Sequence, residues 1–106
     1  MLDCKAAPWK DAFFIRAKKE GMEKAGIFEG DYALVCPQPS VKEGEPVSVA
    51  LGGELLIRYF VRKNGTIFLC KEKADPAPIE IPIGQDDFRF LGKVVTVIRF
   101  TSGPFA

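Results

Sequence analysis

Apolar and polar residues alternate along most of this chain in short runs that glycine and proline interrupt, which is the pattern of a β-rich protein. The one stretch with helical character, 20–27, is only one or two turns long, too short to be stable without packing. We therefore expect a mostly β fold of about six to eight strands, in twisted antiparallel sheets, with one short helical turn. The runs with strand character are 13–17, 32–36, 47–51, 54–63, 66–73 and 86–100.

Glycine-containing turns predict how several of these runs pair. Gly52-Gly53 separates 47–51 from 54–63, and two adjacent glycines supply the positive φ of a tight hairpin turn. Asn64-Gly65 follows directly and is the strongest short hairpin signal. These two turns predict a meander of three antiparallel strands.

The last part of the chain contains an edge signal and a bulge signal. Segment 74–83 holds prolines at 76, 78 and 82, which suits an edge strand or an extended loop because proline cannot donate to a sheet. Segment 86–100 is long, β-branched and aromatic, and we expect it to close the sheet. Gly92 lies inside it and predicts a bulge or a bend.

Length and charge limit the possible functions. With 106 residues the chain is long enough for one domain, and we expect an N-terminal arm over 1–11 and a folded domain over 12–106. The apolar share of 47% and the charged share of 27% are those of an ordinary globular protein. A net charge of +1 lacks the basic excess of a nucleic-acid-binding surface, so direct DNA binding by this chain is disfavoured.

The cysteines and the absence of histidine limit which metal sites, disulfides and catalytic mechanisms the chain can have. Cys4, Cys36 and Cys70 show no CxxC spacing, which favours buried free thiols in a reducing cytoplasm over a zinc site or a disulfide framework. The chain has no histidine. This excludes a serine or cysteine nucleophile that is activated by a histidine base, and it removes the commonest metal ligand. We predict no metal, no cofactor and no membrane segment, since no apolar run reaches about 18 residues.

Two motifs and their order resemble a known family. The strand 13–17 leads into a small-residue turn with Gly21-Met22, and Gly-Ile-Phe-Glu-Gly-Asp follows at 26–31. Residues 92–99 read Gly-Lys-Val-Val-Thr-Val-Ile-Arg. Over residues 12–100 the chain resembles the C-terminal, signal-peptidase-like domain of the LexA and UmuD self-cleaving proteins. The resemblance implies a β-clip-like fold, a Ser–Lys peptidase dyad and homodimers formed through the last strand.

The chain departs from this family at both positions of the dyad. The nucleophilic serine of the family immediately precedes the methionine, where this chain has Gly21, and the general-base lysine falls on Arg58. Glycine has no hydroxyl, and arginine stays protonated and cannot act as a base. Alternation along 54–63 places Arg58 between apolar neighbours on one strand face, where we expect it to form an ion pair with Glu20 or Glu23.

These departures predict a catalytically inactive, LexA-like dimerisation or regulatory module of a transcriptional repressor or stress-response regulator. The resemblance implies that DNA is bound only through a separate helix-turn-helix domain. We expect the dimer interface along the apolar last strand, at Val95, Val97, Ile98 and Phe100.

Two alternatives remain open at this level. The first is an active Ser–Lys self-cleaving peptidase whose motif is out of register, with small residues Ala6 and Ala7 near the family's scissile position. The second is a peptide-binding module with a groove along the proline-rich segment 75–82.

Overall fold

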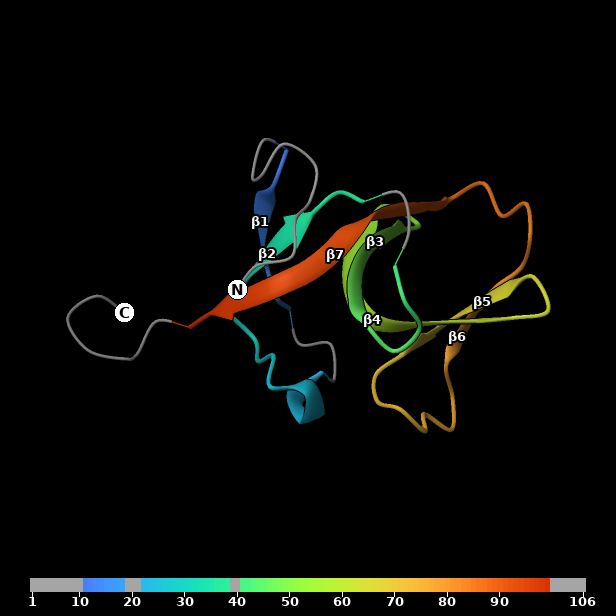
Figure 1. Ribbon diagram of the computed structural model, residues 1–106, viewed down its shortest axis with the longest axis horizontal. Coiled ribbons are helices and arrows are strands. Elements are labelled where there is room, and N and C mark those ends of the chain that lie inside the picture. Colours follow the sequence, from blue (N-terminus) through green and yellow to red (C-terminus); the bar gives the residue numbers. More distant parts are fainter. Residues whose placement is uncertain (1–10, 19–21, 39–40, 100–106) are drawn as a thin grey trace.

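The computed structural model describes residues 11–18, 22–38 and 41–99, and it is a single curved antiparallel sheet (Figure 1). Its seven strands lie in the order β1-β2-β7-β3-β4-β5-β6, and the sheet is accompanied by one short 3-10 helix, η1. The predicted mostly β fold with a single helical turn is confirmed. The elements are β1 (Phe13–Arg16), η1 (Glu23–Ala25), β2 (Tyr32–Cys36), β3 (Pro46–Leu51), β4 (Glu54–Lys63), β5 (Thr66–Cys70), β6 (Ile79–Ile81) and β7 (Phe88–Ile98).

Both predicted hairpins form at the predicted turns. Gly52 and Gly53 have φ values of 58° and 84° and join β3 to β4. Asn64 and Gly65 have φ values of 51° and 79° and join β4 to β5. Asn64 is the one non-glycine residue with positive φ in the described part of the chain, which fits the tolerance of asparagine for left-handed backbone.

The strand β7 lies in the middle of the sheet and not at its edge. It pairs with β2 on one side and with β3 on the other, so it joins two groups of strands. We expected the segment 86–100 to close the sheet. It completes the sheet from a central position, between β2 and β3. A long run without proline can serve two neighbours at once, whereas the proline-flanked β6 is an edge strand, as expected.

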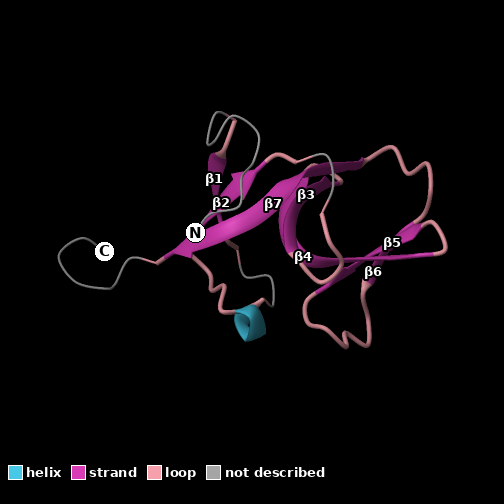
Figure 2. Cartoon of the chain, in the orientation of Figure 1, coloured by secondary structure: helices cyan, strands magenta, loops and turns pink. Residues whose placement is uncertain are grey.

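A bulge occurs at the predicted glycine. Ser48 pairs with Gly92 and Val49 pairs with Phe90, so the register shifts by one residue beside Gly92. A second shift in the pairing of β2 with β7 lies between Leu34 and Val35. Bulges increase the local twist of a sheet. Figure 2 shows that β3 and β4 curve strongly beside the long β7.

The curved sheet encloses two apolar cores on opposite faces of β4. Ile57 and Tyr59 pack in the first core, and Leu56 and Phe60 pack in the second, which confirms the predicted alternation. The buried members of the first core are Ile15, Ala17, Met22, Ile27, Ala33, Val35, Ile57 and Val94. Those of the second core are Val47, Val49, Phe60, Leu69 and Ile81.

The cysteines agree with the prediction where the structure describes them. Cys36 and Cys70 are buried thiols that form no disulfide within the described residues, and Cys4 lies outside them. Burial raises the pKa of the Cys70 thiol, and the nearby Asp75 carboxylate adds to this effect. Both thiols therefore behave as small core residues. In the described part of the chain, no helix has the length and apolar character needed to span a membrane.

Candidate functional site

One neighbour of each predicted dyad position packs in the first core. Gly21 lies outside the described residues, but its neighbour Met22 is 2% exposed and packs in the first core. Ile57, the neighbour of Arg58, is fully buried in that same core. The fold thus brings Met22 and Ile57 to one region, although they are far apart in the sequence. Arg58 lies on the opposite face of β4, between Leu56 and Phe60.

The turn that follows Met22 is held by its own backbone. The carbonyl of Met22 accepts hydrogen bonds from the amides of Ala25, at 2.9 Å, and Ile27, at 3.2 Å. Gly26 ends η1 in the left-handed conformation, with φ 82°, and its amide donates to the Glu23 carbonyl. A glycine suits this position because a side chain there costs energy. These bonds fix the direction in which the chain leaves the loop.

A buried carboxylate connects this turn to the end of β7. Asp31 is 2% exposed, and its Oδ2 accepts a hydrogen bond of 2.8 Å from the Phe28 amide. Arg99 donates from Nε to Asp31 Oδ1, at 2.9 Å, and from Nη2 to Oδ2, at 3.0 Å. Its Nη2 also donates to the Gly26 carbonyl, and its guanidinium lies 4.5 Å from the centre of the Phe28 ring. We call this group of Gly26, Phe28, Asp31 and Arg99 the Arg99 clamp.

The electrostatics of the clamp favour an ionised carboxylate. The hydrogen bonds from Arg99 hold the pKa of the Asp31 carboxyl below its usual range, and the bond from the Phe28 amide acts in the same direction. Burial alone would raise this pKa, so the hydrogen bonds outweigh desolvation. Asp31 is therefore a structural anion and not a candidate acid or base at neutral pH.

Arg58 is a buried cation within the sheet. It is 6% exposed, and its Nη1 donates a hydrogen bond of 2.8 Å to the carbonyl of Ile57. Hydrogen bonds from the amides of Lys71 and Ala77 hold the pKa of Asp75 below its usual range, and the charge of Arg58 adds to this. The neighbours of Arg58 on the same strand face, Leu56 and Phe60, pack in the second core, which agrees with the predicted alternation.

The predicted partners of Arg58 remain a prediction. Glu20 lies outside the described residues, and Glu23 is exposed on η1. On the other side of the turn, Lys24 Nζ lies 2.6 Å from Glu72 Oε1 and links η1 to the loop after β5. A hydrogen bond from Lys24 to Glu72 raises the pKa of the lysine. The amine therefore holds its proton more firmly and is less suited to act as a base.

The hydroxyl of Ser48 does not supply a substitute nucleophile. Ser48 is fully buried on β3 and pairs with Ile57, and among the described residues its Oγ has no hydrogen-bond partner. Ser40 and Ser102 lie outside the described residues. A hydroxyl enclosed by apolar side chains cannot reach a peptide carbonyl of a substrate.

We expect Ser48→Ala to leave the free energy of unfolding unchanged or to raise it by up to about 1 kcal/mol, because it removes a buried polar group without a partner. Urea unfolding of the two proteins measures this difference. Ser48→Thr, which keeps the hydroxyl and adds a methyl group to a filled space, is the matched control and should destabilise. A loss of more than about 1 kcal/mol in the alanine variant would reveal a hydrogen bond to the hydroxyl.

The predicted interface residues lie in different environments at the end of β7. Val97 packs against the first core, Val95 is partly buried at the register shift, and Ile98 is 40% exposed. Phe100 lies outside the described residues. From Val94 to Ile98 the pairing described for β7 is with β2 alone, because its pairing with β3 ends at Lys93. Among the described residues, this stretch therefore has one open edge.

Comparison with known proteins shows the family of this chain. The model of the peptidase S24-like family matches residues 2–95. The chain belongs to the peptidase S24-like family. A LexA repressor of Geobacter metallireducens is 36% identical over 87 residues, which are 82% of this chain and 43% of the relative. A LexA repressor of Citrifermentans bemidjiense is 39% identical over 88 residues, 83% of this chain and 44% of the relative.

A more distant bacterial relative gives the same result. A LexA repressor of Streptomyces clavuligerus is 35% identical over 89 residues, which are 84% of this chain and 36% of the relative. This S24-like chain thus spans less than half the length of the relatives that it matches. The predicted LexA-like family and β fold are confirmed. The assignment of the dyad positions to Gly21 and Arg58 stays a prediction.

Sequence reasoning missed the Arg99 clamp, although both of its ends lie in the motifs that carry the family resemblance. Asp31 ends the turn motif and Arg99 ends the motif of the last strand. The available signal was that the two motifs end in residues of opposite charge, which could form an ion pair. The pairing of β2 with β7 brings the two motifs together.

Proposed function

We propose that this chain is a catalytically inactive S24-like domain that acts as a dimerisation and regulatory module of a transcriptional repressor or stress-response regulator. The proposal rests on the sequence motifs, which assign Gly21 and Arg58 to the two dyad positions in a chain that keeps the family's fold. The hydroxyl that would attack and the amine that would accept its proton are both replaced. The names of the LexA repressor relatives support the regulatory part of the proposal.

A dimer fits the open edge of β7. An unpaired strand edge with apolar side chains is a template for pairing with another chain, and Ile98 is an exposed apolar residue beside it. In this proposal Val95, Ile98 and Phe100 contact the second copy, and Val97 supports them from the core side. DNA binding belongs to a separate domain, in line with the net charge of +1.

Intact mass after incubation at alkaline pH tests the inactivity. We expect the mass of the purified chain to stay unchanged for days, because neither a nucleophile nor a base is present at the dyad positions. A product cut near Ala6 or Ala7 would overturn this and favour the alternative of an active peptidase with a displaced motif. Adding a LexA repressor with an intact dyad in parallel shows that the conditions permit cleavage.

Light scattering at increasing concentration tests the dimer. We expect a dimer, and we expect Ile98→Asp to shift it to a monomer because a carboxylate at the interface must lose its hydration. Leu55→Asp is the matched control, since Leu55 is also 40% exposed but lies on β4. A monomeric parent protein at high concentration, or equal effects of the two variants, would contradict the proposed interface.

A further inference from the structure

An apolar hollow opens at the end of the second core, far from the open edge of β7. It has a volume of about 360 Å³ and lies between the β4–β5 hairpin and the segment that returns from β6 to β7. Figure 1 shows β5 and β6 at one end of the longest axis and the end of β7 at the other. Its lining comprises Arg62, Gly65, Ile67, Ile81, Pro82, Ile83, Gly84, Gln85 and Phe88.

The hollow has an apolar floor and an exposed apolar rim. Ile81 belongs to the second core, and Ile67 and Phe88 pack against that core. Ile83 is 81% exposed, the largest exposed fraction among the large apolar side chains in the described ranges. A β-carbon on Gly65 would lie only 2.9 Å from Ile83 Cδ1, so the isoleucine leans over the hairpin turn. Exposed apolar surface around a hollow is typical of interaction sites.

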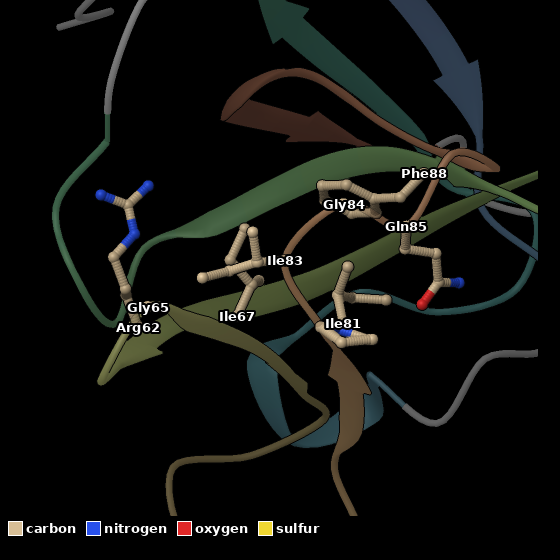
Figure 3. Close-up of a pocket in the computed structure, with 9 residues that line it drawn as sticks. Arg62, Gly65, Ile67, Ile81, Ile83, Gly84, Gln85 and Phe88 are labelled. Carbon is tan, nitrogen blue, oxygen red and sulfur yellow. The ribbon is translucent and has the colours of Figure 1, made fainter.

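One cation stands at the rim of this hollow. Figure 3 shows Arg62 on one side of the hollow and Gln85 on the other, with the isoleucines between them. The guanidinium of Arg62 lies 5.5 Å from the centre of the Phe60 ring, which orients it. Among the described residues Arg62 has no carboxylate partner. On the opposite side, Gln85 Nε2 donates to Asp87 Oδ1 at 2.7 Å, so that the amide is held in place.

We propose that this hollow is a docking site for an extended peptide segment of a protein partner, in which a bulky aliphatic side chain stands next to a carboxylate. The aliphatic side chain enters between Ile67, Ile81 and Phe88 and covers Ile83. The carboxylate pairs with Arg62, whose charge is the complement that the rim offers. Ile83 is so exposed that a small ligand in the hollow would not cover it. The site therefore suits a macromolecular partner, whose larger surface can bury this side chain.

The site is independent of the proposed dimer. The open edge of β7 and the hollow lie at opposite ends of the molecule, so a second copy at β7 leaves the hollow accessible (Figure 1). Failure of the docking proposal therefore leaves the proposed function intact, and the reverse also holds.

Titration of the isotope-labelled protein with acetyl-Leu-Asp-amide, followed by NMR, tests the proposal. We expect chemical shifts to change at residues 62–67 and 81–88, with a dissociation constant in the millimolar range that suits a dipeptide. The isosteric probe acetyl-Leu-Asn-amide should bind up to about fivefold more weakly, since it lacks the charge that pairs with Arg62. Equal binding of the two probes, or shifts scattered over the surface, would overturn the proposal.

Substitutions with matched controls complete the test. Arg62→Gln and Ile83→Ser should each weaken binding of the aspartate probe, and Arg62→Glu should reverse the preference in favour of acetyl-Leu-Lys-amide. Arg16→Gln is the control for charge, because Arg16 also stacks on an aromatic ring, that of Tyr32, at the other end of the sheet. Phe14→Ser is the control for exposed apolar area, with Phe14 53% exposed on β1. Controls that weaken binding as much as the site variants would also overturn the proposal.

Discussion

Replacing Asp31 by alanine is expected to lower the free energy of unfolding by about 3 kcal/mol. The carboxylate is 2% exposed and accepts hydrogen bonds from the Phe28 amide and from Arg99. Its removal leaves the Phe28 amide without this acceptor and detaches the turn 26–31 from the end of β7. Urea unfolding followed by circular dichroism measures the loss.

Two further variants distinguish the clamp from a general effect of removing a charge. Glu29→Ala removes an exposed carboxylate from the same turn and should change the unfolding free energy by less than about 0.5 kcal/mol. The double variant Asp31→Ala/Arg99→Ala should cost less than the sum of the single variants, because the two residues share their hydrogen bonds. Strict additivity would show that the clamp contributes nothing as a pair.

The clamp also predicts a pH dependence of stability. Because the pKa of Asp31 is lower in the folded protein, its contribution is fully present above the unfolded carboxyl pKa of about 4 and is lost as pH falls through the lowered value. Asp75 and Glu45 also have lowered pKa values, so the parent protein keeps some acid sensitivity from them. The difference between the parent and Asp31→Asn in urea unfolding therefore isolates Asp31, and it should shrink below pH about 4. A difference that is constant with pH would contradict this.

Gly92→Ala is the second substitution with a large expected effect, a loss of about 3 kcal/mol. The added β-carbon would lie 2.5 Å from the carbonyl oxygen of Cys36 and 2.8 Å from its carbonyl carbon. These are backbone atoms of β2, which cannot move without disturbing the pairing of β2 with β7. Thermal and urea unfolding both report the loss.

Thr96→Ala on the same strand is the comparison for Gly92→Ala. Thr96 is partly buried and pairs with Leu34, so this variant tests a side-chain change in β7 without a new contact to the backbone. It should cost about 1 kcal/mol or less. If Gly92→Ala costs no more than Thr96→Ala, the glycine is not needed for the close approach of β2.

Local patterns predicted the local parts of this fold. The turns at Gly52-Gly53 and Asn64-Gly65 depend on backbone conformations that few residues adopt, so the sequence alone identifies them. The bulge beside Gly92 follows from similar reasoning. The central place of β7 could not be predicted in this way, because a run of apolar residues has the same appearance at the centre of a sheet and at its edge.

The candidate site shows the same division between local and distant contacts. Alternation along β4 predicted that Arg58 lies between the apolar residues Leu56 and Phe60, and the family motif predicts that Gly21 stands at the nucleophile position. The Arg99 clamp joins residues 68 positions apart in the sequence, and only strand pairing places them together. The hollow beside Ile83 was not predicted either. The alternative of a groove along 75–82 overlaps the hollow only at Ile81 and Pro82, and the rest of the lining comes from the β4–β5 hairpin and the segment before β7.

The central place of β7 affects how this protein is made on the ribosome. In the described residues, β1 pairs with β2, and β3 to β6 pair in succession, so the two groups meet only through β7. Since β7 follows the other described strands of this sheet in the chain, both groups are synthesised before it, with an unpaired inner edge on β2 and on β3. Translation must pass residue 98 before the sheet can close. This sheet is therefore most exposed to mispairing and aggregation just before β7 leaves the exit tunnel.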